Sequence, residues 1–162
     1  MTLVLHAGAK PIDYDDLRAL STPPATQTHV PIPHHRVMDP APYSLSYYGH
    51  EVVERHFGVT EDGMRFFGVL TLRSPYGDYC DTLGLRNSHD KSLPIGVAFG
   101  SKVFVCDNLS FNADIVIKRK HSVNVTGIDR RATFAIISRS MPACLQAASQ
   151  TAAAHRNASH PT

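Results

Sequence analysis

The spacing of apolar and polar residues changes about a third of the way along the chain. Near the start, Leu17 and Leu20 recur at helical spacing behind Asp13, a residue type that suits the N-cap of a helix. A second helix is predicted from Asp39, as N-cap, to Gly49, which suits the end of a helix. The first third of the chain therefore predicts one or two short helices.

After position 49 the pattern changes to short runs of strand-forming residues separated by turn residues, which is typical of an antiparallel sheet. The segment 94–106 contains Gly100 and fits either one bulged strand or two strands. Because the connections are short, we expect an α+β domain whose antiparallel sheet has about five to six strands. The expected strands are residues 50–57, 64–73, 79–86, one or two within 94–106, and 113–118.

Two stretches show neither period. Residues 21–33 are rich in proline and polar residues, which favours an extended, polyproline-like connector or arm. From residue 131 onward the chain is rich in Ala, Ser and Thr, so we expect a poorly ordered tail that is disordered or partly helical. The expected organisation is an N-terminal helix and arm over 1–36, a core domain over 37–130 and a tail over 131–162.

Length and composition are those of a single globular domain. The chain has 162 residues, of which 43% are hydrophobic, and it lacks the run of about 18 apolar residues that a membrane span needs. The start carries no basic leader before an apolar stretch, so we expect a cytoplasmic protein without a membrane partner. Cys80, Cys106 and Cys144 are widely spaced and predict reduced thiols.

Charge is distributed unevenly along the chain. The first 63 residues carry four Lys and Arg against eight Asp and Glu, a net charge of −4. Because the whole chain has a net charge of +2, the remaining residues carry a net charge of +6. A basic surface of this kind can bind the phosphates of single- or double-stranded nucleic acid. The residues predicted to do so are Lys118, Arg119 and Lys120, together with Arg86 and Lys91. The competing interpretation is that lysines and arginines merely blunt a sheet edge.

The stretch LGLRNSHDKSLPIGVAFGSKVFVCDNLSF, followed by IKRKH, resembles the phage/plasmid-like domain-of-unknown-function 932 family. Upstream, THVPIPHHRV, YYGHEVVE and FGVLTLRSPYGDY extend the resemblance to residues 28–130. The resemblance implies a protein of mobile genetic elements such as plasmids, without an established activity, and it carries over no catalytic residues. Family members continue into helices after the position of residues 128–130, so the change of composition near Arg131 predicts a truncated N-terminal portion.

One polar loop is a candidate for catalysis. His89 and Asp90 supply a general base and a carboxylate in residues 86–91, and Asp107 is an alternative carboxylate for a hydrolase or nuclease. The alternative interpretation is a purely structural turn, because Asn, Ser and Asp side chains form hydrogen bonds with local backbone groups. Among the histidines, the His34–His35 pair and the run from His50 to His56 lack metal-ligand spacing, so we expect no metal and no cofactor.

Three functions follow from the sequence. The first is a non-enzymatic, mobile-element-derived domain that binds nucleic acid through its basic residues. The second is a truncated remnant or an accessory protein that acts by contact with other proteins. The third is the hydrolase or nuclease based on His89 with Asp90 or Asp107. The sequence leaves enzymatic activity open and favours a non-enzymatic domain.

Overall fold

The computed structural model describes residues 9–47, 49–73, 81–100, 104–105, 111–112 and 115–121. Its helices are α1 (Tyr14–Ala19), α2 (His34–Met38) and α3 (Pro40–Tyr47). Its strands are β1 (Ala9–Pro11), β2 (Val52–Thr60), β3 (Arg65–Leu72), β4 (Thr82–Ser88), β5 (Ile95–Gly100), β6 (Phe104–Val105), β7 (Phe111–Asn112) and β8 (Ile115–Arg119). The predicted tail over 131–162 lies outside the described residues.

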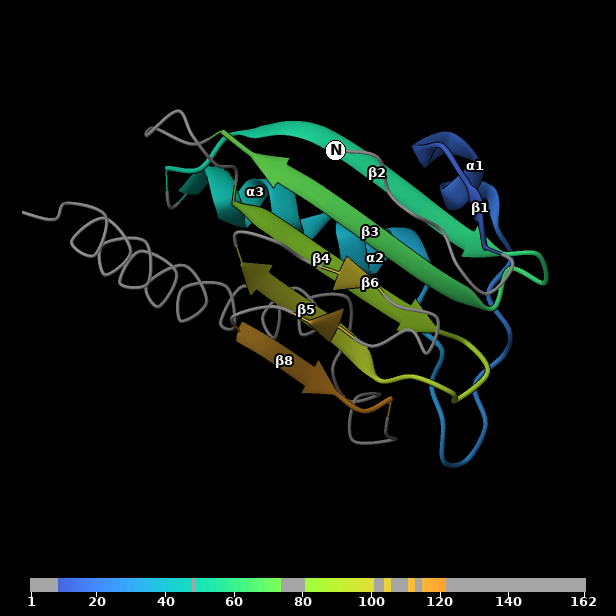
Figure 1. Ribbon diagram of the computed structural model, residues 1–162. Coiled ribbons are helices and arrows are strands. Elements are labelled where there is room, and N and C mark those ends of the chain that lie inside the picture. The colour runs from blue at the N-terminus through green and yellow to red at the C-terminus, as the bar shows by residue number, and fades with distance from the viewer. Residues whose placement is uncertain are drawn as a thin grey trace, which may run out of the picture.

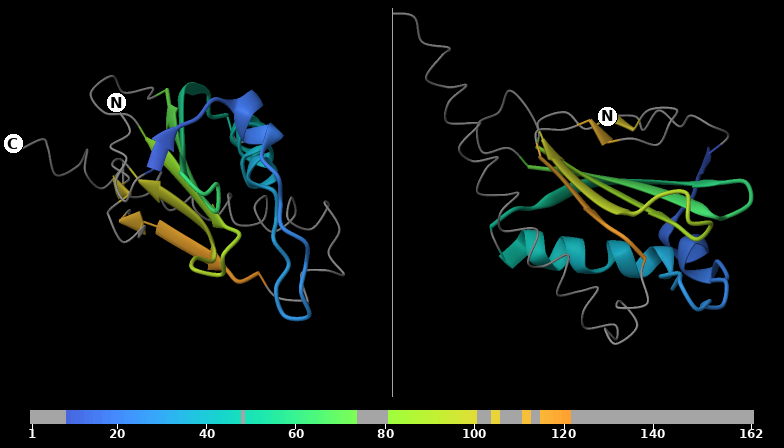
Figure 2. Two further views of the ribbon diagram at one scale, coloured as in Figure 1. Left: turned by 90° about the vertical axis from the view of Figure 1, so that its right-hand side faces the viewer. Right: turned by 90° about the horizontal axis from the view of Figure 1, so that it is seen from below.

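The strands form a six-stranded sheet in the order β1-β2-β3-β4-β5-β8, and every neighbouring pair is antiparallel (Figure 1). A separate two-stranded sheet pairs β6 with β7. The helices lie on one face of the large sheet, and the β6–β7 pair lies on the other (Figure 2). The predicted α+β class and the predicted antiparallel sheet are confirmed.

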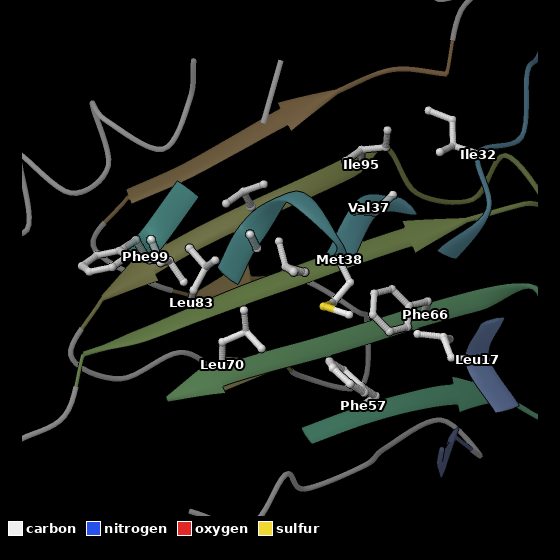
Figure 3. Packing of buried hydrophobic residues seen from close by; sticks show 14 of the residues in the cluster. Leu17, Ile32, Val37, Met38, Phe57, Phe66, Leu70, Leu83, Ile95 and Phe99 are labelled. Carbon is white, nitrogen blue, oxygen red and sulfur yellow. The ribbon is translucent and has the colours of Figure 1, made fainter. Parts of the chain in front are cut away.

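The central strands are buried because both of their faces are covered. Every residue of β4 and β5 is buried, and β3 is buried from Phe66 to its end. Residues that alternate along these strands point to the helix side, where Leu70, Leu83 and Phe99 pack with Met38 and Val37 of α2 (Figure 3). The core therefore sits between the sheet and the helix layer.

Two predicted helix ends are confirmed. The Asp13 side chain accepts a hydrogen bond from the Asp16 amide at 2.8 Å, which caps α1. Helix α3 ends before Gly49, whose φ of +81° is a conformation that glycine adopts without strain. Local chemistry was sufficient to predict both boundaries.

The turn between β2 and β3 also follows from its residues. The Gly63 amide donates to the Thr60 carbonyl at 2.8 Å, and Gly63 has a φ of +72°. The Asp62 carboxylate accepts hydrogen bonds from the Thr60 hydroxyl at 2.6 Å and from the Met64 amide at 3.0 Å. This closed turn places the Gly63 carbonyl where α2 can reach it.

The structure differs from the predicted elements in several places. Strands β1 and β7 were not predicted, and Asp39, the expected N-cap of the second helix, has helical φ and ψ at the end of α2. Helix α2 begins at His34, directly after Pro33, which makes no side-chain cap hydrogen bond and so gave no start signal. Strand β4 continues through Asn87 and Ser88, which the sequence had placed in a loop, because both residues pair with β3. The segment 94–106 contains two strands in different sheets, which decides between the two alternatives.

The proline-rich stretch 21–33, hereafter the connector, packs against the domain at its C-terminal part. Residues 24–28 are exposed, whereas His29 and Ile32 are buried. Ile32 belongs to the same apolar cluster as Leu17 of α1 and Ile95 of β5 (Figure 3). The connector is therefore joined to the core at one end of the sheet.

Among the helices that the structure describes, none has the length and apolar character needed to cross a membrane.

Shortening Leu70 tests the assignment of the core. Leu70→Ala is expected to lower the free energy of unfolding by about 2–5 kcal/mol, because it removes buried methyl groups and leaves a cavity between β3 and the helices. The matched truncation Val53→Ala, at a side chain that is 45% exposed, is expected to change it by less than about 0.5 kcal/mol. Urea unfolding followed by circular dichroism measures both, and equal losses would contradict the assigned core.

Candidate functional site

Four histidines from separate parts of the chain meet at one end of the sheet. We call them the histidine cluster: His29 of the connector, His34 of α2, His89 after β4 and His121 after β8. Each is buried, with between 2% and 7% of its surface exposed. Histidine is seldom fully buried without a reason, so the cluster is the first candidate for a functional site.

Hydrogen bonds define the protonation state of His34. The His34 Nε2 atom lies 2.9 Å from the Gly63 carbonyl, which can only accept, so Nε2 carries the proton. The Asn87 Nδ2 group donates to the Ile32 carbonyl at 2.7 Å and lies 3.0 Å from His34 Nδ1. His34 Nδ1 must therefore accept from Asn87. Both contacts are satisfied only when His34 is neutral and protonated at Nε2.

His89 is held by the same carbonyl. Its Nε2 atom donates to the Ile32 carbonyl at 2.9 Å, so this one oxygen accepts from both Asn87 and His89. The ring of His89 stacks on that of His34 with 3.9 Å between centroids and 5° between planes. His34 also stacks on Phe66, at 5.6 Å, which continues the stack into the core.

The other two histidines extend the cluster. His29 Nε2 donates to the His89 carbonyl at 3.2 Å. The ring of His121 lies 5.2 Å from that of His29, tilted by 59°. The backbone of Val30 is hydrogen-bonded to the ring of His121. His89 Nδ1 and the amide oxygen of Asn87 are buried without a hydrogen-bond partner. Buried polar atoms in this state are uncommon and point to a functional constraint.

Burial favours the uncharged form of three of the four rings. It lowers the pKa of His34 to about 4, assisted by His89 and opposed by the hydrogen bond to Gly63. It likewise lowers the pKa of His121 to about 4, assisted by His29. Burial also lowers the pKa of His89, against the effect of its hydrogen bond to Ile32. His34, His89 and His121 are therefore neutral imidazoles at pH 7.

The predicted His89–Asp90 pair does not assemble into a catalytic dyad. The His89 ring faces inward toward His34 and Ile32, whereas the Asp90 carboxylate accepts from Arg65 Nε at 2.9 Å and from the Ser92 amide and hydroxyl. Burial by itself would raise the pKa of Asp90, but these hydrogen bonds lower it to about 2. Asp90 therefore serves the loop that follows β4. The alternative carboxylate, Asp107, lies outside the described residues.

Among the described residues, no group of three or more His, Cys, Asp or Glu side chains is placed to hold a metal ion. In the histidine cluster the reason is geometric. Both nitrogens of His34 and the Nε2 atom of His89 are hydrogen-bonded to backbone carbonyls or to the Asn87 amide. The candidates His50 and His56 do not belong to the cluster.

The predicted phosphate-binding residues separate into two groups. Lys118, Lys120 and Lys91 are exposed. Arg86 is buried in β4, opposite Gly96 of β5 and Phe67 of β3, and burial lowers its pKa. Arg86 therefore does not join an exposed surface, because its strand lies in the middle of the sheet. The side chain of Arg119 lies outside the described residues, although its backbone ends β8.

The exposed lysines and the histidine cluster lie at the same end of the sheet. The register pairs Ile95 with Arg119, and the loop that carries Lys91 leads directly into Ile95. Lys120 precedes the buried His121 by one residue. We call Lys91, Lys118 and Lys120 the lysine rim, because they surround the end of the sheet at which the imidazoles are buried.

Sequence reasoning identified some of these residues but not their arrangement. His34 was considered for a metal, and His89 for catalysis, while Asn87 was assigned to a loop and His29 received no role. The available signal was that THVPIPHHRV, LGLRNSHD and IKRKH each contain a histidine of the cluster. Comparison of the chain with protein-family models, with curated proteins and with solved structures finds no match. The resemblance that those segments suggested stays a prediction.

The stability of the domain is expected to fall on mild acidification. The folded-state pKa values of His34 and His121, about 4, lie below the ordinary value of 6.5, so the unfolded chain binds more protons between these limits. The free energy of unfolding should therefore decrease from pH 6.5 to pH 4, by on the order of 3 kcal/mol per buried histidine. Urea titrations across this range measure the loss, and a flat profile would contradict the neutral cluster.

Asn87→Asp tests the polar network with almost no change of shape. The variant places a carboxylate oxygen against the Ile32 carbonyl and removes the donor to His34, so we expect a loss of about 2–4 kcal/mol in the free energy of unfolding at pH 7. The control Gln27→Glu makes the same amide-to-acid change at an exposed residue of the connector and should have little effect. Thermal unfolding compares them, and equal Tm values would contradict the network.

Proposed function

We propose that this domain binds the phosphate backbone of single-stranded or otherwise accessible nucleic acid through the lysine rim. The observation that carries the proposal is that Lys91, Lys118 and Lys120 are all exposed at one end of the sheet. Clustered lysines attract polyanions because binding releases the counterions condensed on phosphates. This proposal makes the domain a binding protein.

The charges around the lysine rim support the proposed binding of nucleic acid. The nearest described carboxylate in sequence, Asp90, already forms a salt bridge with Arg65 at 2.9 Å, so it offsets less of the positive charge of Lys91. The four buried histidines add no negative charge, since an imidazole is either neutral or positive. The end of the sheet therefore presents a net positive surface to a phosphate chain.

The position of β8 also supports the proposal. Strand β8 is the last strand in the order of the described sheet, so an extended chain can lie along it without displacing a described neighbour. Lys118 lies within β8 and Lys120 directly beyond its end, which places two positive charges along one line. A flexible single strand can follow such a line more easily than a stiff duplex.

The enzymatic alternative receives less support from the arrangement. Catalysis by His89 would need a carboxylate or a substrate at its ring, and Asp90 is bonded elsewhere. The interpretation of lysines as a blunted sheet edge predicts no measurable affinity for nucleic acid and is an outcome of the experiment below. The origin in a mobile element remains part of the proposal, on the strength of the segments quoted above.

Titration with fluorescent oligonucleotides across a salt series tests the proposed function. The substitution of Lys91, Lys118 and Lys120 together by Ala should weaken binding to a mixed-sequence single strand and flatten the logarithmic salt slope by roughly 2, since each lost phosphate contact removes about 0.7. Lys10→Ala is a suitable control, because Lys10 is an exposed lysine of β1 paired with Glu61 at 3.0 Å. An unchanged slope in the triple variant, or no binding by the parent chain at low salt, would reject the function.

A further inference from the structure

The connector is attached to the sheet by side-chain hydrogen bonds. Four of its residues are proline, and proline has no backbone N–H to donate to a strand. Within the described residues, its main-chain hydrogen bonds join Thr26 to His29 and the Pro33 carbonyl to Arg36 of α2, and none of these pairs it with a strand. Its links to the end of β4 instead use imidazole and amide groups, namely His29 to the His89 carbonyl, and Asn87 and His89 to the Ile32 carbonyl.

One of these links, from Asn87 to Ile32, depends on a neutral His34, whereas the Nε2–H donors of His29 and His89 persist when those rings are protonated. Protonation of His34 would put an N–H on Nδ1, directly facing the Asn87 amide group that now donates to it across 3.0 Å. Asn87 could turn its carbonyl oxygen toward His34, but its donor would then leave the Ile32 carbonyl. A single proton on His34 therefore costs Asn87 either its hydrogen bond to His34 of α2 or its hydrogen bond to Ile32 of the connector.

A second proton is opposed by the stack. The rings of His34 and His89 are parallel at 3.9 Å, and two positive charges at this distance in a buried site repel strongly. Phe66 covers the other face of His34, so the ring cannot retreat into the core. The repulsion is relieved only when the His34 and connector side of the contact moves away from β4.

The surrounding charges do little to offset the repulsion between protonated His34 and His89. His29 and His121 face His89 and would add positive charge on protonation. His35 of α2 acts on His34 in the same direction. Asp90 is the facing carboxylate on the side of His89, and it is already bonded to Arg65 and Ser92. Acidification therefore accumulates positive charge where the connector meets the sheet.

We propose that the histidine cluster is a proton-operated latch, which holds the connector on the sheet at neutral pH and releases it on mild acidification while the sheet stays folded. The sheet does not depend on the latch for its own hydrogen bonds, because its strands are joined by main-chain ladders from β1 to β8. The connector has no such ladder. The latch does not rest on the proposed binding of nucleic acid.

The latch is tested by NMR on the full chain between pH 7.5 and pH 4. The {1H}-15N NOE values of the His29, Val30 and Ile32 amides should fall as the pH decreases, while those of Leu70 and Leu85 in the sheet stay high. The fall should follow the titration of the His34 and His89 ring nitrogens in the same samples. Connector amides that stay rigid until the sheet itself unfolds would overturn the latch.

A variant without the two titrating rings provides the control. His34→Gln with His89→Gln keeps an N–H that can reach the Gly63 and Ile32 carbonyls but cannot be protonated in this range. The release should then disappear or move to lower pH, whereas His50→Gln, outside the cluster, should leave it unchanged. Release of the connector at an unchanged pH in the double variant would overturn the latch. If that variant does not fold, the coincidence of ring titration and amide release in the parent chain decides.

Discussion

The carbonyl oxygen of Ile32 is the point at which the separate parts of this domain are joined. It accepts hydrogen bonds from Asn87, near the end of β4, and from His89, directly after β4. The Ile32 side chain packs in the apolar cluster. The connector thereby fixes where α2 begins, and α2 places Val37 and Met38 over the sheet. A proline-rich segment without a main-chain ladder is held in place by two side chains.

This arrangement explains why polar residues are buried in an apolar sheet. Asn87 and His89 satisfy a backbone carbonyl that would otherwise lose its hydrogen bond to water on burial. The hydrogen bond from Asn87 to His34 requires a neutral His34, so the same residues that complete the fold make it sensitive to protons. The lysine rim adds positive charge at the same end of the sheet, which is the basis of the proposed binding to a phosphate chain.

Much of the fold could be predicted because its signals are local. Asp13, Gly49 and the turn at Gly63 each act within a few residues, and the alternating strands reveal the sheet. The histidine cluster could not be predicted, because its hydrogen bonds join residues that are 29 to 60 positions apart. Asn87 and Ser88 were misassigned because residues of these types usually occur in turns, whereas the ladder with β3 holds them in a strand.

The measurement that tests this account most directly is the tautomeric state of the histidines at pH 7, from the 15N chemical shifts of their rings in the full chain. The hydrogen bonds to backbone carbonyls require that His29, His34 and His89 all carry their proton on Nε2. The predicted result is a proton on Nε2 of all three rings and a bare Nδ1 on His34. A proton on Nδ1 of His34, or a ring without a proton on Nε2, would contradict the assigned hydrogen bonds and with them the attachment of the connector to the sheet.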